Sequence, residues 1–481
     1  MIFQSKDSCR IQTLKKKLIT RTRNESENST SGSSQPPDSA VLHAPSHNFT
    51  SIPMRAFRIL FACPQTLFDV SNGATMQCYT MLQTLSKLNF QTASIGGGIF
   101  DNPSGQARIP NFKEQVSDKS KGEILVNVDS SANPDNPIRH YFFTGFKSTN
   151  WNNITSQEAG KFLFHYSKLL RAFKPDIVIG FGCDALCRSM WMEARLFGIP
   201  TAYIICNGNH QNYRFPLHDI LLCDSEATSR FYKEKEGLTV HPMGNFINPK
   251  LVIAQNRSPQ AVTLINPCFA KGVAVAARLI LMANKERPDI PFLIVETRQK
   301  LAEALKLLKK PGGKPGSAFG HQTFRNITIR PATYEVKDIY KLTGVLLAPS
   351  LWYESWGRVA TEAVMNGIPV LASSSGGLPE AVAGGGIILD APKECSGDRN
   401  NWLALPSEES CRPWADALYK LYDERMSAYW QEKCQKAAQT NSPLACAEKL
   451  LRAIGPLLQK RAGDGDFSHK GSLRFPSDPI A

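Results

Sequence analysis

The sequence Gly-Ile-Pro occurs twice in this chain, at residues 198–200 and 367–369, each time between a predicted helix and an apolar run of strand length. Glycine commonly ends a helix, and proline is tolerated at the first residue of a strand because no ladder donor is needed there. The helix before each copy follows another apolar run, at 176–180 and at 344–347. The repeated order of strand, helix and strand predicts a parallel sheet in each half of the chain.

Further strand and helix patterns extend this alternation. At 481 residues the chain is also too long for one ordinary core. We therefore predict an α/β fold of two Rossmann-like, doubly wound domains that face each other across a central cleft, with the junction near 242–249. The other predicted elements are strands at 57–63, 91–95, 123–128, 139–143, 261–266, 291–295 and 327–330, a helix through Met81 to Leu88, and a helix from Val273.

Changes in composition mark the segment boundaries. The first residues are polar and lack hydrophobic periodicity, so a disordered leader is expected there. Met54 directly precedes the first strand and is expected to be the natural start of the protein, with a basic tether as the alternative role for the leader. The predicted segments are a leader at 1–53, an N-terminal domain at 54–243, a C-terminal domain at 244–430, C-terminal helices at 431–460 and a flexible tail at 461–481.

The composition narrows the class of protein. The net charge of +14 fits attraction to anionic ligands, anionic lipid surfaces or nucleic acid, but no zinc finger, RNP-like aromatic strand or basic helical stripe supports nucleic acid. No apolar run reaches the eighteen or so residues that a membrane span needs. The first residues lack an apolar signal region and the 12 cysteines lack paired spacing, so we expect reduced thiols in the cytoplasm.

Glu354 and Glu362 flank the predicted start of a helix near Gly357. Free N–H groups and the helix dipole make such a start a binding site for phosphate oxygens. A carboxylate beside a diphosphate is repelled unless it accepts hydrogen bonds, and sugar hydroxyls are the obvious donors. The pair therefore suits a nucleotide-sugar, with the ribose diol on one glutamate and the transferred sugar on the other. The alternative is an exposed loop glutamate and a solvated helix glutamate.

The residues around this pair form a long motif. Ser350-Leu-Trp-Tyr-Glu-Ser-Trp-Gly-Arg-Val-Ala-Thr-Glu-Ala is continued by Gly367-Ile-Pro-Val-Leu-Ala-Ser and by Gly376-Gly-Leu-Pro-Glu-Ala-Val. This motif resembles the C-terminal signature of the retaining glycosyltransferases of family 4 (group 1), which have the GT-B fold. The broader resemblance covers about 55–458. It implies a donor on the C-terminal domain, an acceptor on the N-terminal domain, and a last helix, around 444–458, that crosses back over both.

The resemblance also implies roles for individual residues. Lys271 matches the family's phosphate-binding lysine, and with the N–H groups of Gly357 and Arg358 it would hold the diphosphate. Glu362 would hold the ribose hydroxyls, while Glu354 would contact the transferred sugar and stabilise oxocarbenium character. No side-chain nucleophile is expected, because the leaving phosphate itself would deprotonate the acceptor.

Two donor-side positions depart from the family's pattern. Asn266, predicted to bind the donor, stands where an arginine is usual, five residues before the lysine. Part of the phosphate clamp is therefore expected either to be weaker or to be supplied from elsewhere, for example by Arg358 or Arg298. Gly73 stands alone after Asn72 where two adjacent glycines are usual, and it would let the backbone approach a ligand.

Cys206 occupies the place of a histidine that is usual in the family. His210, four residues later, is the predicted substitute as a contact to the sugar or acceptor, and a surface histidine is the alternative. Ser355, in the same motif, is also expected among the donor-binding residues. Glu380 and the pair Gly376-Gly377 are expected to shape the neighbouring loop rather than to perform chemistry.

Two other motifs are interpreted as having no ligand. Gly180-Phe-Gly-Cys-Asp-Ala resembles a dinucleotide fingerprint, but the next strand ends without an acidic residue for a ribose, so these glycines are expected to serve packing. Asp464-Gly-Asp466 lies in the polar tail without a strand before it, and no His or Cys spacing suits zinc. We therefore expect catalysis without a metal or another cofactor.

Together these features predict a retaining hexosyltransferase of polysaccharide biosynthesis that moves a sugar from a nucleotide-diphosphate donor to a hydroxyl acceptor. A glycan or a lipid-linked acceptor is expected, with no nucleic acid partner. The expected location is the cytoplasm, with peripheral contact to an anionic membrane at its inner face left open. A sugar-nucleotide epimerase on the same fold and a non-catalytic sugar-nucleotide-binding scaffold remain as alternatives.

Overall fold

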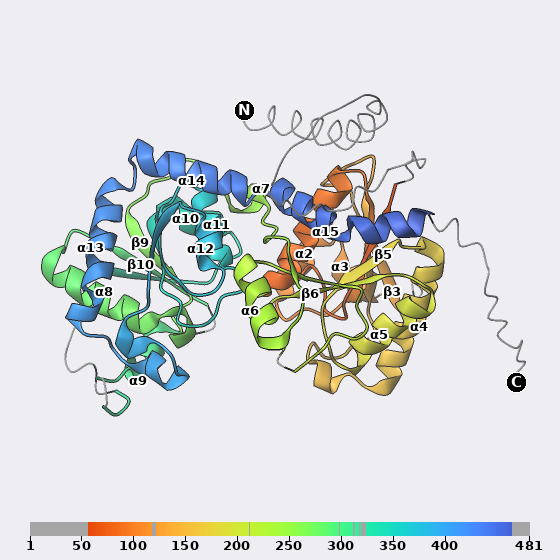
Figure 1. Cartoon of the computed structure of the whole chain (residues 1–481), viewed down its shortest axis with the longest axis horizontal. Coiled ribbons are helices and arrows are strands. Elements are labelled where there is room, and N and C mark those ends of the chain that lie inside the picture. The colour runs from red at the N-terminus through yellow and green to blue at the C-terminus, as the bar shows by residue number, and fades with distance from the viewer. Residues whose placement is uncertain are drawn as a thin grey trace, which may run out of the picture. The chain divides into compact units, whose positions relative to one another are not determined.

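The structure is a computed structural model that describes residues 56–117, 122–210, 212–297, 299–310, 313–316, 318 and 324–463. The predicted leader at 1–53, Arg298 and the tail beyond residue 463 lie outside the described residues. Residues Arg58–Leu457 form one compact unit, which contains both sheets described below. Figure 1 shows the elements along the chain.

The first sheet has eight strands in the order β3-β4-β2-β1-β5-β6-β7-β8. All neighbouring strands pair in parallel except β3 and β4, which are antiparallel. The strands are β1 (Arg58–Ala62), β2 (Gln91–Gly97), β3 (Ile124–Asp129), β4 (Ile138–Phe143), β5 (Ile177–Gly180), β6 (Thr201–Ile205), β7 (Ile220–Cys223) and β8 (His241–Pro242).

Helices of the first half begin at side chains that cap their free N–H groups. Thr155 and Glu158 form a capping box at α4, and Asp184 and Ser225 cap α5 and α6. Buried residues of α4 and α5, including Phe162 and Trp191, pack against one face of the sheet. The helices are α2 (Gly73–Lys87), α3 (Phe112–Ser117), α4 (Ser156–Phe173), α5 (Ala185–Leu196) and α6 (Glu226–Glu236).

The second sheet has six parallel strands in the order β11-β10-β9-β12-β13-β14. This is the doubly wound order, in which the chain reverses direction across the sheet between β9 and β12. The strands are β9 (Ala261–Ile265), β10 (Phe292–Glu296), β11 (Ile327–Pro331), β12 (Thr343–Ala348), β13 (Val370–Ser373) and β14 (Gly386–Leu389).

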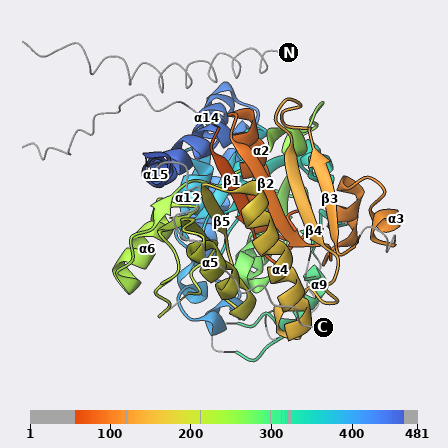
Figure 2. The same ribbon diagram turned by 90° about the vertical axis from the view of Figure 1, so that its right-hand side faces the viewer.

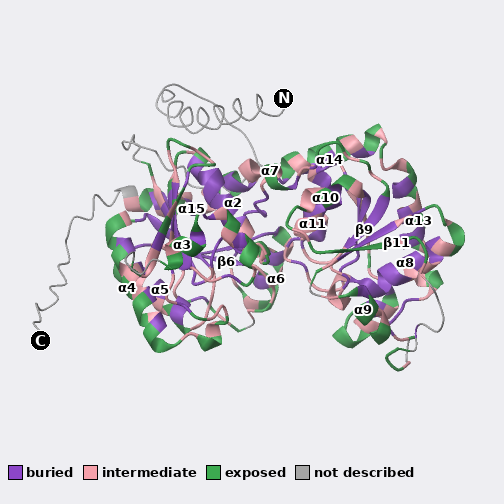
Figure 3. Ribbon diagram, turned by 180° about the vertical axis from the view of Figure 1, so that it is seen from behind, coloured by how far each residue is buried: buried purple, intermediate pink, exposed green. Residues whose placement is uncertain are grey.

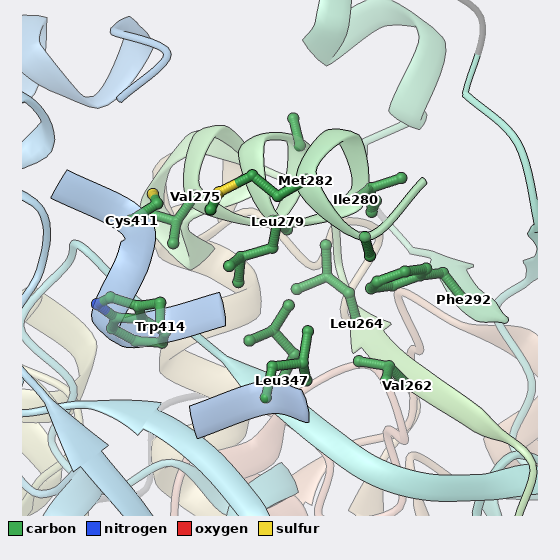
Figure 4. Packing of buried hydrophobic residues seen from close by; sticks show 14 of the residues in the cluster. Val262, Leu264, Val275, Leu279, Ile280, Met282, Phe292, Leu347, Cys411 and Trp414 are labelled. Carbon is green, nitrogen blue, oxygen red and sulfur yellow. The ribbon is translucent and has the colours of Figure 1, made fainter. Parts of the chain in front are cut away.

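Helices cover both faces of this sheet. One face packs against α8, α9 and α13, and Figure 4 shows Leu264 and Phe292 of the strands under α8 with its Leu279, and Trp414 of α13 at the other end of the same cluster. The other face packs against α11, α12 and α14. In Figure 3 the strands are largely buried and the outer faces of the helices exposed. The helices are α7 (Pro249–Val252), α8 (Val273–Glu286), α9 (Leu301–Leu307), α10 (Val336–Leu342), α11 (Arg358–Met365), α12 (Leu378–Val382), α13 (Glu408–Glu424), α14 (Ala428–Thr440) and α15 (Pro443–Gly463).

The Gly-Ile-Pro repeat has the structure that its sequence predicts. Gly198 and Gly367 have φ of 64° and 68°, in the left-handed region where a helix can end on glycine, and the following isoleucines are buried. The predicted strands all form, with ends shifted by a few residues. Helices α3, α4, α6, α7, α9, α10, α12 and α13 and strands β7, β8 and β14 were not predicted. Gly180 and Gly182 serve packing as expected, because a Cβ on either would overlap Ala62 or Cys187.

No helix within the described part of the chain is long and apolar enough to cross a membrane. The cysteines from Cys63 to Cys446 are free thiols, as their spacing predicts.

Candidate functional site

Glu354 and Lys271 meet at the carboxyl ends of two neighbouring strands. Lys271 lies in the turn after β9 and Glu354 in the loop after β12, and β9 and β12 are adjacent in the sheet. The ammonium of Lys271 donates to Oε1 of Glu354, and the hydroxyl of Ser350 donates to the same oxygen at 2.6 Å. The glutamate is buried while the lysine side chain is about one third exposed, at 36%. The loop therefore presents a fixed carboxylate with a cation that a ligand can reach.

Glycines allow these two loops to approach each other. Gly272 has φ of 78°, and a Cβ there would lie 1.9 Å from the carbonyl oxygen of Pro349. A Cβ on Gly376 would lie 2.1 Å from the carbonyl oxygen of Glu354, and the N–H of Gly377 donates to that oxygen at 2.7 Å. Gly376 and Gly377 thus support the backbone on which Glu354 is carried, as the sequence predicted for this pair.

Helix α11 begins at Arg358 directly after this loop. Gly357 precedes it with φ of 113°, and no side chain caps the free N–H groups of the first turn. Nε of Arg358 lies 2.7 Å from Oε1 of Glu362, and the hydroxyl of Tyr340 donates to Oε2 at 2.8 Å. Each carboxylate oxygen retains a lone pair for a further donor. The helix start therefore combines uncapped N–H groups, a guanidinium and an oriented carboxylate.

Asn266 follows β9 with φ of 64°, and its Oδ1 is buried without a hydrogen-bond partner in the described structure. A buried amide oxygen without a donor is costly, so a ligand donor at this position would be favourable. The arginine that is usual in the family is replaced here by the uncharged side chain of Asn266. Arg358 is the described candidate for that charge, since Arg298 lies outside the described residues.

Segments of the first half of the chain lie against the same loop. An ideal Cβ built on Gly73, at the start of α2, would be 4.0 Å from Cδ of Arg358. The hydroxyl of Ser355 donates to the carbonyl oxygen of Cys206 at 2.8 Å. Gly73 and Arg358 are thus brought together as the site requires, whereas Ser355 already uses its hydroxyl in a contact to the loop after β6.

His210 has other partners. Its Nε2 is 3.4 Å from the hydroxyl of Tyr203, its Nδ1 is 4.0 Å from Sγ of Cys183, and its backbone N–H donates to the hydroxyl of Tyr232 at 3.3 Å. Burial lowers the pKa of this imidazole, so the neutral form is favoured. The described hydrogen bonds of His210 therefore join it to the first half of the chain, and none joins it to another candidate residue.

Sequence reasoning missed Asp224, which follows β7. Its Oδ1 accepts a hydrogen bond from Gln77 at 2.8 Å, and its Oδ2 lies 3.5 Å from the hydroxyl of Ser355. Burial raises the pKa of this carboxyl to about 6. The local sequence signals only a helix cap at Ser225, because the contact to Ser355 spans 131 positions.

The sequence also did not predict the hydrogen bonds that Tyr340 and Glu380 make. Tyr340 is fully buried in α10 and its hydroxyl orients Glu362. The carboxylate of Glu380 accepts from the N–H groups of Glu226 and Ala227 at 2.8 Å each, at the start of α6. Glu380 therefore fixes α6 beside the loop of Glu354, which extends the loop-shaping role that the sequence predicted.

The arrangement is suited to an anionic ligand with hydroxyl groups. Lys271, Arg358 and the uncapped start of α11 can hold phosphate oxygens, and Glu354 and Glu362 can accept from hydroxyls. No group of three metal-ligating side chains occurs among the residues that the structure describes.

A family model described as glycosyl transferases group 1 matches residues 325–409. This segment contains Glu354, Arg358 and Glu362. The chain resembles the group 1 glycosyl transferases. This is the family whose signature the sequence predicted.

Curated relatives carry the name D-inositol 3-phosphate glycosyltransferase. The relative from Mycobacteroides abscessus is 26% identical over 235 residues, which are 43% of this chain and 49% of that protein. The relative from Corynebacterium glutamicum (strain R) is 29% identical over 185 residues, 38% of this chain and 37% of that protein. The chain thus spans about half the length of these relatives or less.

Solved structures establish the fold. A glycosyltransferase from Rickettsia africae ESF-5 superimposes with a TM-score of 0.55 at 13% identity, over 84% of this chain and all of that one. Anabaena Alr3699/HepE in complex with UDP-glucose gives 0.53 at 12% identity, over 83% of this chain and 99% of that one. The fold is GT-B, with two parallel-sheet α/β domains, as predicted.

Proposed function

We propose that the chain is a retaining glycosyltransferase that moves a sugar from a nucleoside-diphosphate donor to a hydroxyl acceptor. The observation that carries this proposal is the Lys271–Glu354 pair beside the uncapped start of α11. Charge develops when a glycosyl phosphate bond breaks, negative on the phosphate and positive on the sugar. The accessible cation and the free N–H groups can stabilise the phosphate, and the fixed carboxylate can stabilise the sugar.

The donor is held by the second sheet in this proposal. Lys271 and the N–H groups of Gly357 and Arg358 hold the diphosphate, and the orphaned Oδ1 of Asn266 accepts from a donor group of the ligand. Glu362, oriented by Tyr340, accepts from the ribose hydroxyls. A uridine nucleotide is the first choice, because the similar Anabaena protein was solved with UDP and with UDP-glucose.

Glu354 contacts the transferred sugar and stabilises positive charge at its anomeric carbon. The departing phosphate takes the proton of the acceptor hydroxyl, so no side chain acts as a nucleophile and configuration is retained. Lys271 neutralises the charge that grows on that phosphate. The reaction as proposed requires neither a metal ion nor another cofactor.

The acceptor in this proposal is a glycan or a lipid-linked molecule of polysaccharide biosynthesis, met at the cytoplasmic face of a membrane. Exposed apolar side chains on two neighbouring helices support contact with such a membrane. Helices α4 and α5 lie side by side (Figures 1 and 2) and expose Phe164, Met192 and Leu196. Lys168 lies 4.3 Å above the ring of Phe164, and Arg171 lies on α4 nearby in sequence. Apolar side chains beside cations are suited to an anionic lipid surface, which supports peripheral contact.

The experiment incubates the purified full chain with a panel of UDP-, GDP- and ADP-sugars and measures release of nucleoside diphosphate, with and without pooled sugar and lipid acceptors. We expect release that rises with acceptor, a product of retained anomeric configuration by NMR, and loss of release in Glu354→Gln. The control is Glu286→Gln, because Glu286 also pairs with a cation, Arg412 at 2.6 Å, but at the far end of α8.

Other outcomes favour the alternatives. Donor consumption that does not depend on any acceptor would favour a sugar-nucleotide epimerase. Binding of a donor without consumption across the panel would favour a non-catalytic scaffold, which the departures at Asn266, Cys206 and Gly73 motivate.

A further inference from the structure

The two cations of the candidate donor site already have carboxylate partners. Lys271 donates to Glu354, and Arg358 pairs with Glu362 at 2.7 Å, so these four side-chain charges cancel. The uncharged Asn266 adds no charge of its own. A diphosphate brings more than one negative charge, and a cation that no carboxylate of the protein holds would bind it most strongly.

Arg108, in the first half of the chain, is a cation of this kind. It is half-buried at the end of a short 3₁₀ helix (Pro103–Arg108). Its Cζ lies 6.0 Å from the centroid of the Tyr79 ring, at the outer limit of a cation–π contact. Within the part of the chain that the structure describes, the guanidinium has neither a hydrogen-bond acceptor nor an ion-pair partner. Its five N–H donors are therefore available to a ligand.

The segment that carries Arg108 is fixed to the first sheet. The buried carboxylate of Asp69 accepts a hydrogen bond from the backbone N–H of Asp101 at 2.6 Å. A Cβ on Gly105 would lie 2.2 Å from the carbonyl oxygen of Phe68, so the helix turn lies directly on the chain below it. A ligand therefore meets a charge whose backbone is already positioned, which reduces the entropy lost on binding.

Arg108 also lies close enough to the start of α11 to interact with its charge. The ring of Tyr79 belongs to α2, and that helix begins at Gly73, where a Cβ would be 4.0 Å from Cδ of Arg358. Burial lowers the pKa of the Arg108 guanidinium, and so does the neighbouring charge of Arg358, while Tyr79 and Glu335 act in the opposite direction. The two guanidinium groups repel each other, and an anion bound beside both relieves that repulsion.

We propose that Arg108 binds the diphosphate of the donor and supplies the cation that Asn266 does not. The inference rests on the proposed function and adds to it a binding residue from the first sheet. Lys271 and the start of α11 hold the diphosphate from the second sheet, and the planar fork of Arg108 donates to phosphate oxygens from the first. Donor affinity thus depends on contacts from both halves of the chain.

The test measures dissociation constants of the purified full chain for UDP, GDP and ADP and for uridine, guanosine and adenosine. Isothermal titration serves for the diphosphates and saturation-transfer NMR for the nucleosides, and the pair whose diphosphate binds most tightly is used with the variants. We expect Arg108→Gln to weaken binding of the diphosphate at least tenfold and of the nucleoside less than twofold, because a nucleoside has no phosphate. Arg108→Lys keeps the charge and should lose less than Arg108→Gln.

Arg139→Gln is the matched control. Arg139 is an exposed arginine at the amino end of β4, whereas Arg108 follows the carboxyl end of β2, to which β4 is parallel. The control should leave both dissociation constants unchanged.

Three results overturn the inference and leave the proposed function standing. They are unchanged diphosphate affinity in Arg108→Gln, an equal loss for diphosphate and nucleoside, and a lysine variant that binds the diphosphate no better than the glutamine variant. Failure of every diphosphate to bind to the unaltered chain instead counts against the proposed function and the inference together.

Discussion

Glu362→Gln is the change that tests the donor site most directly. It keeps the shape of the side chain and removes its charge. In the structure one carboxylate oxygen is bound to Arg358 at 2.7 Å and the other to the hydroxyl of Tyr340 at 2.8 Å. A glutamine can keep its oxygen toward Arg358 and turn its amide toward the tyrosine hydroxyl, which can also accept. The fold should therefore survive the change.

The expected loss follows from the hydrogen bonds. A hydrogen bond to a charged group contributes about 1.5 to 3 kcal/mol and a neutral one about 0.5 to 1.5, so each ribose hydroxyl loses about 1 kcal/mol. Two hydroxyls lose about 2 kcal/mol, which corresponds to about 30-fold weaker binding of the donor. The rate at saturating donor should change much less, because the ribose is not at the reacting bond.

Isothermal titration with UDP and with the UDP-sugar gives the two dissociation constants, and steady-state kinetics gives kcat. Glu354→Gln should show the opposite pattern, with kcat reduced about 100-fold or more and UDP binding nearly unchanged. Glu286→Gln, the glutamate paired with Arg412, should change neither quantity. If Glu362→Gln binds UDP as tightly as the unaltered chain does, or if both site variants show equal, small effects, the division of roles is wrong.

Three further changes probe the same region. Lys271→Ala should reduce kcat about 100-fold, measured as acceptor-dependent nucleoside diphosphate release, because the growing phosphate charge loses its cation; an unchanged kcat would contradict this role. Gly272→Ala should lower the free energy of unfolding in urea by about 2 to 4 kcal/mol, since its φ is 78° and a Cβ would overlap Pro349. Gly384→Ala, at φ of 82° with open space around it, should cost only about 1 kcal/mol, and equal losses would refute the overlap. For Asp224, burial raises the pKa from 3.8 to about 6, so between these pH values the folded chain holds a proton that the unfolded chain has lost, and stability falls as pH rises. Relative to the unaltered chain, Asp224→Asn should therefore gain up to about 3 kcal/mol in unfolding free energy between pH 4 and 6 and no more above pH 6; a difference that does not vary with pH would refute this.

Local patterns predicted much of the candidate site. The helix start at Gly357, the glutamates on either side of it and the lysine after a buried strand could all be read from the order of apolar runs and turn residues. The expected role of His210, as the substitute for the family's histidine, stays a prediction, because local sequence patterns do not test it. Its hydrogen bonds to Cys183, Tyr203 and Tyr232 depend on how the loop after β6 folds back, which no local pattern encodes.

The sequence by itself determined most of the strands, helices α2, α5, α8 and α11 among those that separate them, the two Gly-Ile-Pro turns and the residue types at the start of α11. These features depend on hydrophobic period and on backbone freedom within a few residues. Only the tertiary structure decided that Lys271 meets Glu354, 83 positions away, and that Tyr340 orients Glu362. The physical reason is the strand order. Strand β9 pairs with β12 as well as with β10, the next strand in the sequence, so loops that are distant in the sequence lie at one edge of the sheet.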